Sequence, residues 1–201
     1  MTWFAAMQFW RCDLSPRTEV FPMGSMGREC PLLLLVLAGC RTVTPAGEGA
    51  RVEGFVFKHE GIVRDVGVFD PEPRAASGTR PLVLVLHGGL GEDDDTIALS
   101  FGKLNRLAEE DGFLVAYPQG VGGHWNDGRN VQRYVAQRER INDVGFLTKL
   151  IDALVEKRRV DPDAVFIVGV SDGAMMAHRF ACERTSKLRA FTAVIGAMPY
   201  N

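Results

Sequence analysis

Four stretches of the chain are apolar and show no regular alternation with polar residues. They cover residues 81–89, 113–120, 164–170 and 191–199. A strand that is buried on both faces gives such a continuous apolar run, and strands of this kind are typical of parallel sheets. These four segments therefore predict the buried strands of a mostly parallel sheet.

Three segments between or after these runs have helical character. Residues 143–162 show it best, because their apolar side chains recur at helical spacing: Phe146, Leu147, Leu150, Ile151, Leu154 and Val155. Asn142 or Asp143 is expected to cap the start of this helix. The other two predicted helices lie in residues 98–112 and 174–184.

Residues 52–71 precede this alternation and predict a β-hairpin around Glu60–Gly61, because two β-branched and aromatic stretches flank that pair. Strands that then alternate with helices specify an α/β fold with a mostly parallel sheet and helices on both faces. The sequence shows no internal repeat and no second globular domain.

The first part of the chain has a different character. Residues 31–39 form a short apolar run that suits a signal peptide, and Leu37–Cys40 resembles the lipobox of bacterial lipoproteins. We therefore predict a mis-assigned extension over 1–22, with the true start at Met23 or Met26. The signal peptide would span 23–39, with lipidation at Cys40, and a flexible tether 40–51. The alternative is a genuine extra segment that contains a buried Leu-rich helix.

The overall composition restricts the class of protein. A hydrophobic content of 46% suffices for a packed core, and a formal net charge of −2 offers no basic surface for nucleic acid. No apolar run is long enough to span a bilayer, so membrane contact is expected only through a lipid anchor at Cys40. The four cysteines form no CxxC pattern that would favour zinc. Cys182 is expected to be a small buried residue.

A serine motif follows the third apolar run. Gly169-Val170-Ser171-Asp172-Gly173 fits G-x-S-x-G and stands between a predicted strand and a predicted helix, which is the context that the motif requires. There the serine occupies a strained turn, and the glycines allow the strand and helix backbones to approach closely. Ser171 is therefore predicted to be a nucleophile. The motif alone also occurs in ordinary turns.

His87-Gly88-Gly89 ends the first apolar run. In this class of fold that loop donates one backbone N–H to the oxyanion hole, and the residue after the nucleophile donates the other. Gly89 is the first choice for the loop donor, with Leu90 as the alternative, and Asp172 is the second donor. Loss of one such donor typically costs about 3 kcal/mol of barrier. His87 is expected to anchor the loop and not to act as a base.

Several motifs together resemble the poly(3-hydroxybutyrate) depolymerase-like esterases, which include feruloyl and acetylxylan esterases and lipoprotein relatives. The resemblance covers about residues 52–201 and rests on RPLVLVLHGG, AYPQG, WNDGR, NDVGFLTKLIDAL, VDPDAVFIVGVSDGAMMAHRFACE and AVIGAMP. It implies a secreted or cell-envelope α/β-hydrolase that cleaves polyester, plant cell-wall or acyl esters. Catalysis would use a Ser-Asp-His triad and no metal or organic cofactor.

On this resemblance Ser171 is the nucleophile, and Gly89 and Asp172 are the oxyanion donors. Relatives commonly carry asparagine where this chain has Asp172. We expect its carboxylate to point away from the hole and to cap the following helix, where a negative charge is favourable.

The segment Trp125–Arg129 follows a predicted strand and has two interpretations. It forms either a self-bonded loop in which Arg129 pairs with a carboxylate, or a cleft wall to which Trp125 contributes substrate contacts. His124 is expected at the surface and Asp143 at a helix cap. Met175 and Met176 are expected to pack inside.

The rest of the triad is not found in the sequence. The triad in this fold runs Ser, then acid, then His, and only thirty residues follow Ser171 (201 minus 171). Their one histidine, His178, lies about 10 Å along the helix from Ser171, too far for a hydrogen bond. We therefore predict a truncated esterase domain without its last strands, with an exposed sheet edge and its acid and base beyond residue 201. The alternative is an inactive ester-binding remnant.

Overall fold

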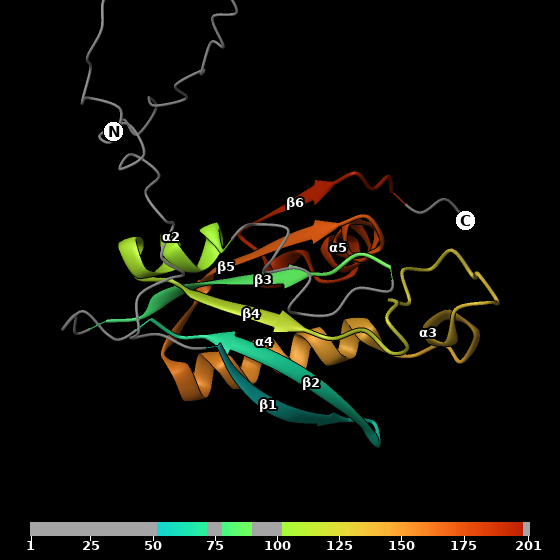
Figure 1. The fold of residues 1–201 in the computed structure, drawn as a ribbon, viewed down its shortest axis with the longest axis horizontal. Helices are drawn as coiled ribbons and strands as arrows, with labels where there is room; N and C mark the ends of the chain where they lie inside the picture. Colours follow the sequence, from blue (N-terminus) through green and yellow to red (C-terminus); the bar gives the residue numbers. More distant parts are fainter. Residues whose placement is uncertain (1–51, 72–77, 90–101, 199–201) are drawn as a thin grey trace, which may run out of the picture. The chain divides into compact units, whose positions relative to one another are not determined.

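The computed structural model describes residues 52–71, 78–89 and 102–198 (Figure 1). The elements in chain order are β1 (Val52–His59), β2 (Ile62–Phe69), β3 (Arg80–Leu86), α2 (Lys103–Asp111), β4 (Leu114–Pro118), α3 (Val135–Arg138), α4 (Asp143–Arg158), β5 (Val160–Val170), α5 (Asp172–Glu183), the short 3-10 helix η1 (Thr185–Lys187) and β6 (Ala190–Val194). The predicted domain divisions at 1–22, 23–39 and 40–51, with Cys40 and Leu90, lie outside the described residues.

The six strands of the described ranges form one sheet in the order β1-β2-β4-β3-β5-β6. The hairpin β1–β2 joins the sheet antiparallel to β4, whereas β4, β3, β5 and β6 run parallel to one another. This arrangement confirms the predicted hairpin and the mostly parallel α/β sheet. Three of the four apolar runs became the inner strands β3, β4 and β5, because helices cover both faces of the sheet there. The fourth run forms β6 at the edge of the sheet, where most of its residues are exposed, so its predicted burial is wrong.

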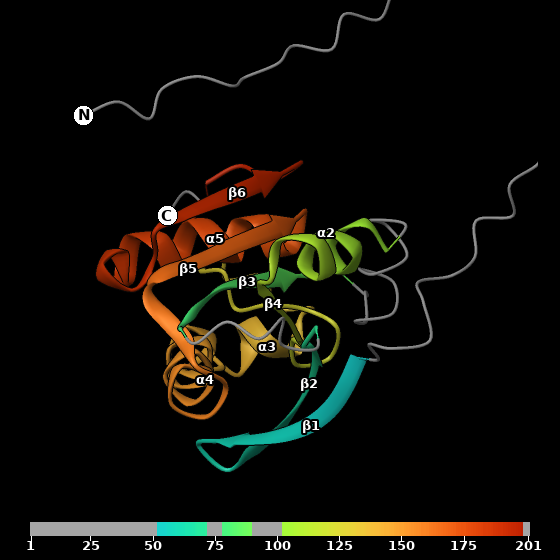
Figure 2. The same cartoon turned by 90° about the vertical axis from the view of Figure 1, so that its left-hand side faces the viewer.

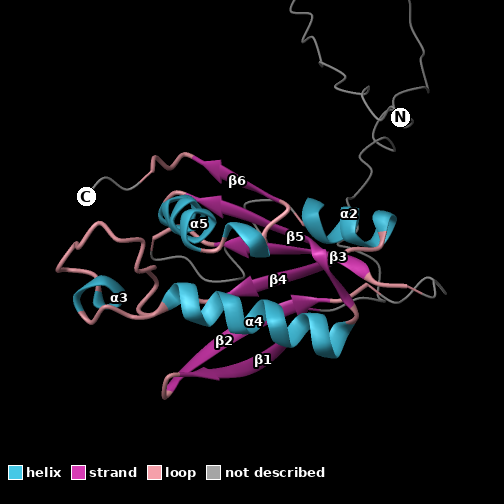
Figure 3. Ribbon diagram, turned by 180° about the vertical axis from the view of Figure 1, so that it is seen from behind, coloured by secondary structure: helices cyan, strands magenta, loops and turns pink. Residues whose placement is uncertain are grey.

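The helices form two layers (Figures 2 and 3). α4 and α5 lie on one face, over the larger core. α2 covers the other face, where Ala108 packs with Phe69, Val85, Val115 and Tyr117.

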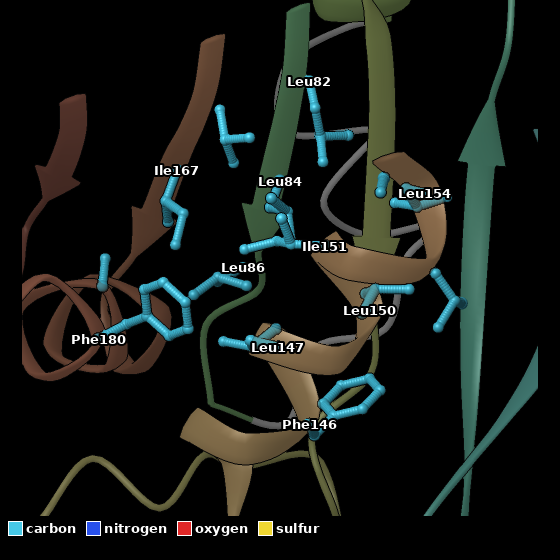
Figure 4. Close-up of a cluster of buried hydrophobic side chains, with 14 of the residues drawn as sticks. Leu82, Leu84, Leu86, Phe146, Leu147, Leu150, Ile151, Leu154, Ile167 and Phe180 are labelled. Atoms are coloured by element: carbon cyan, nitrogen blue, oxygen red, sulfur yellow. The ribbon is translucent and has the colours of Figure 1, made fainter. Parts of the chain in front are cut away.

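The apolar stripe of α4 forms the centre of the larger core (Figure 4). Leu147, Leu150 and Ile151 are at most 2% exposed, and they face Leu84 of β3 and the strands beside it. Fully burying a side chain of this size stabilises a fold by roughly 1.5–3 kcal/mol. The packing confirms the helix that the 3.6-residue spacing predicted.

Local details differ from the sequence-based expectations. α3 and η1 were not predicted, because elements of 4 and 3 residues show no periodicity. α4 ends at Arg158 and β5 begins at Val160, so Pro162, at the end of the predicted helical segment, lies in the strand. Cys182 is exposed in the last turn of α5, so its predicted burial is wrong. No helix in the described ranges is both long and apolar enough to cross a membrane.

β6 is the last strand in the sheet order and pairs only with β5 within the described part of the chain. Its exposed apolar side chains include Phe191 and Val194, and Ile195 beyond its end is 88% exposed. An exposed sheet edge was expected here. Unpaired N–H and C=O groups at such an edge favour the addition of another strand.

Candidate active site

Ser171 lies at the turn between β5 and α5, with φ 52° and ψ −111°. A positive φ is unusual for a residue with a side chain, and such strain is maintained only where the surroundings impose it. Here the Ser171 N–H donates to the Val194 carbonyl of β6 at 2.8 Å. The strained conformation that the sequence predicted for Ser171 is therefore confirmed, and the residue is exposed.

The two glycines of the motif are required by close backbone contact. A Cβ at Gly169 would overlap the carbonyl of Gly173, and a Cβ at Gly173 would overlap the carbonyl of Leu86 in β3. The motif therefore packs the start of α5 directly against the end of β3. This contact brings the serine turn next to the loop that follows β3.

That loop contains Gly88 and Gly89. A Cβ at Gly88 would lie 3.5 Å from the Ser171 Cβ, and a Cβ at Gly89 would lie 2.9 Å from the His124 Cε1. The backbone N–H groups of Gly89 and Asp172 donate to no residue of the described ranges. The two amides that were predicted as oxyanion donors thus have no described acceptor: one belongs to the residue after Ser171, and the other to the neighbouring glycine loop.

His87 anchors this loop through hydrogen bonds to backbone groups, as expected. Its Nε2 accepts a hydrogen bond from the Gly120 N–H at 2.8 Å, and its Nδ1 lies 2.6 Å from the Gly88 carbonyl. These partners assign the proton to Nδ1, because a carbonyl can only accept. Burial lowers the pKa of His87, in keeping with a neutral ring.

Trp125 lies beneath the loop and not in the cleft. It is 0% exposed, and its indole N–H donates to the His87 carbonyl at 3.0 Å. The prediction that Trp125 lines the substrate cleft is therefore wrong, because the buried indole N–H takes this carbonyl as its partner. The alternative is confirmed, since Arg129 and Asp127 pair within the same loop.

A buried ion pair lies beside Trp125, where the guanidinium carbon of Arg64 is 5.8 Å from the indole ring centroid. Arg64 of β2 lies 2.8 Å from Asp143, and both side chains are at most 3% exposed. The other Asp143 oxygen accepts from the Asn126 N–H at 2.7 Å. Burial raises the pKa of Asp143, opposed by the Arg64 charge. The predicted cap role of Asp143 is wrong, because Asn142 caps α4 through the Gly145 N–H.

A second charged cluster opens into the cleft. The Asp172 carboxylate accepts hydrogen bonds from the Arg129 guanidinium and from Nδ1 of His124, the latter at 2.8 Å. The carboxylate lies in the first turn of α5, where a negative charge is favourable, but it accepts from these side chains and from no described backbone N–H, so the expectation of a hydrogen-bonded cap is wrong. His124 is 7% exposed, so its predicted surface position is wrong as well. Two cationic or donor side chains thus compensate the charge of the Asp172 carboxylate.

The cleft beside Ser171 has a volume of about 630 Å³. Its lining residues come from the serine turn, the glycine loop and the segment after β4: Gly89, Gly122, His124, Arg129, Arg133, Tyr134, Val135, Ser171, Asp172 and Met175. Met176 is buried as expected, but Met175 faces the cleft. The described ranges contain no group of three or more metal-ligating side chains.

No described histidine or carboxylate forms a hydrogen bond with the Ser171 hydroxyl. His178, which the sequence had ruled out as the base, packs edge-on against Phe191 with ring centroids 5.2 Å apart. His124 shares the cleft with Ser171, but its hydrogen bond goes to Asp172. The described part of the chain therefore presents the serine that was predicted to be the nucleophile and the two predicted backbone donors, with no base bonded to the serine hydroxyl.

Comparison with known proteins places this site in a family. The sequence model described as Esterase PHB depolymerase matches residues 67–198. The chain belongs to the Esterase PHB depolymerase family. A relative from Nocardia uniformis subsp. tsuyamanensis, NocK, which is named as an esterase, is 35% identical over 120 residues, covering 60% of this chain and 34% of NocK. The bifunctional acetylxylan esterase/xylanase XynS20E of Neocallimastix patriciarum is 27% identical over 139 residues, covering 69% of this chain and 19% of the relative.

Solved structures show the same fold. An acetyl xylan esterase from Aspergillus awamori superposes with a TM-score of 0.53 at 20% identity, covering 68% of this chain and 48% of that one. A ferulic acid esterase gives 0.56 at 17% identity, covering 76% and 60%. The chain thus spans less than two thirds of each of these four proteins. The family match confirms the resemblance that the sequence motifs indicated.

Proposed function

We propose that the protein is a serine carboxylic-ester hydrolase in which Ser171 is the nucleophile. The observation that carries the proposal is the strained Ser171 turn, placed against the Gly88–Gly89 loop by the contact of Gly173 with β3. Membership of an esterase family supports the same chemistry. The substrate would be a carboxylic ester. A polyester or an acylated plant cell-wall polymer would fit the family, since two matched proteins are named as acetylxylan esterases.

The geometry supports a two-step acyl transfer. The Ser171 hydroxyl oxygen would attack the ester carbonyl, and the negative oxygen of the tetrahedral intermediate would accept from the N–H groups of Gly89 and Asp172. Loss of the alcohol would leave an acyl-serine, which water would then hydrolyse. Two preorganised donors are the main contribution of the described residues to this chemistry.

The base and its acid belong to the proposal as well. In this fold they follow the nucleophile along the chain, and no described imidazole bonds to Ser171. We therefore propose that a segment outside the described ranges supplies both. If no such segment exists, the cleft would bind esters without hydrolysing them.

The cellular location is also a proposal. The apolar run 31–39 before Cys40 suggests export and a lipid anchor. Replacing Cys40 by Ser should abolish incorporation of labelled fatty acid and release the protein from the cell envelope. Continued labelling of the C40S variant would contradict the anchor.

Hydrolysis of p-nitrophenyl butyrate by the complete gene product tests the proposed function. The S171A variant should lose at least about 10³-fold in kcat/KM, because nucleophile and base act as one unit. It should also lose labelling by a fluorophosphonate, located by peptide mass spectrometry. Ser186 in η1 is exposed and does not line the cleft, so S186A is the matched control. Unchanged turnover of S171A would overturn the proposal.

A further inference from the structure

His124 is held in one orientation on several sides. Its Nδ1 lies 2.8 Å from Asp172, and its ring stacks on Tyr134 with centroids 3.7 Å apart and an interplanar angle of 19°. On a third side its Cε1 approaches Gly89 so closely that a Cβ there would be only 2.9 Å away. Arg129 in turn holds Asp172 and is itself paired with Asp127. These contacts on several sides fix the orientation of the His124 ring, which is not typical of a surface histidine.

The partners of the ring identify its free atom. A carboxylate only accepts hydrogen bonds, so Nδ1 of His124 carries a proton toward Asp172. In the neutral ring Nε2 then has a lone pair. The described residues supply no hydrogen-bond partner for Nε2. Because it is also not one of the fully buried polar atoms that lack a partner, this atom is accessible to solvent. Because His124 lines the same cleft as Ser171, a bound ligand can reach Nε2.

The position of this atom restricts what it can bind. Nε2 is bonded to Cε1, the ring atom that lies against Gly89, whose N–H is the proposed oxyanion donor. A group that hydrogen-bonds to Nε2 would lie about 3 Å further into the cleft. It would therefore belong to a part of the ester within a few bonds of the scissile carbonyl.

From this geometry we propose that His124 is a specificity-determining residue, whose Nε2 accepts a hydrogen bond from a hydroxyl group near the ester carbonyl of the substrate. The inference rests on the proposed function, because it assumes that the cleft receives an ester. Asp172 and Arg129 are positioning residues in this arrangement. The hydroxyl can belong to the acyl part or to the alcohol part of the ester, and both present the same donor.

Paired esters separate these two sources. One pair is a β-hydroxyacyl ethyl ester and its O-methyl ether, and the other is a glycerol monobutyrate and its O-methylated counterpart. The parent gene product should prefer the hydroxyl member of one pair by about tenfold in kcat/KM, which corresponds to about 1.4 kcal/mol. The pair that shows the preference identifies the side of the ester.

Two variants assign the preference to the ring. H124F keeps an aromatic ring against Tyr134 but removes the acceptor, so it should hydrolyse both members equally. H124Q retains an acceptor and should recover part of the preference. H59Q, at the end of β1, is the matched control and should behave as the parent. A parent that prefers the hydroxyl member of neither pair, or an unchanged preference in H124F, would overturn the inference.

A binding measurement makes the inference independent of turnover. In S171A, the imidazole carbon-bound proton signals of the four histidines can be assigned by the H124Q and H59Q variants. Titration with the hydroxyl ester should move the His124 signal at a lower concentration than titration with its ether does. Equal titration curves would contradict the role of His124. If the parent hydrolyses no ester but the His124 signal discriminates, the proposed function fails and the recognition by His124 stands.

Discussion

Two histidines flank the glycine loop, and they differ in what their second nitrogen does. His87 uses both ring nitrogens on backbone groups, at Gly88 and Gly120, and is 2% exposed. His124 uses only Nδ1 on a described partner and lines the cleft. The first ring is therefore a closed structural link, whereas the second has an atom left for a ligand.

The same contrast holds for the ion pairs beneath and beside them. Arg64 and Asp143 are sealed under Trp125, and Arg64 also lies 4.0 Å from the ring of Phe146. Arg129 is 26% exposed where it meets Asp172. Similar pairs of residue types thus serve two regions. One is the sealed network, formed by Arg64, Asp143, Trp125 and His87, which holds the loops. The other is the open cluster, formed by Asp172, His124 and Arg129, which faces the cleft. We expect substitutions in the sealed network to reduce mainly stability, and those in the open cluster to alter mainly selectivity.

The largest effect on folding should come from D143A. It leaves the Arg64 charge buried without its carboxylate, and loss of one partner of a buried pair typically costs about 3–5 kcal/mol. The free energy of unfolding in urea measures this. The control is E53A, whose ion pair with Arg158 is 61% exposed on the glutamate side and should contribute at most about 1 kcal/mol. Equal effects of the two variants would remove the distinction between sealed and open charges.

The buried parts of the molecule, which are the sheet, α4 and the sealed network, show what the sequence could predict. Continuous apolar runs and one helical stripe sufficed for the sheet and α4, because burial on two faces or on one face leaves a regular pattern. His87 was correctly predicted as an anchor, since it precedes two glycines at a strand end. The burial of Trp125 was not predicted, because the sequence agrees equally well with a buried indole and with one that lines the cleft.

The open cluster was missed because its contacts are long-range. His124 and Asp172 are 48 positions apart, and neither lies in a periodic pattern that would link them. The one signal available was the acidic side chain of Asp172 directly after the predicted nucleophile. A charge at an oxyanion donor needs a partner nearby, so His124 and Arg129, beside the carboxyl end of β4, could have been considered together.

D172A should have a smaller effect on folding than D143A. It removes the partner of His124, but Arg129 keeps Asp127 and remains partly open to water, so we expect a loss of about 2 kcal/mol. The same urea titration measures it. D172N should lose less, because the amide oxygen still accepts from His124. If D172A proves as destabilising as D143A, the cluster is part of the core framework and not an accessory to the cleft.

The smallest effect is a change in how stability depends on pH. Burial lowers the pKa of His87 below its ordinary value of 6.5, so the unfolded chain takes up this proton at a higher pH than the folded protein does. Stability from the neutral ring is fully present above 6.5 and is lost as the pH falls through that value toward the folded pKa, by at most about 1.4 kcal/mol per pH unit.

H87Q tests this dependence, because glutamine can still accept from the Gly120 N–H but does not titrate. Unfolding free energies of the parent and H87Q should differ less under mildly acidic conditions than at neutral pH, since only the parent loses this contribution on acidification. A constant difference between the parent and H87Q across the pH range would show that the His87 ring is not protected from protonation. Water would then reach the His87 ring, and the sealed network would not exclude solvent.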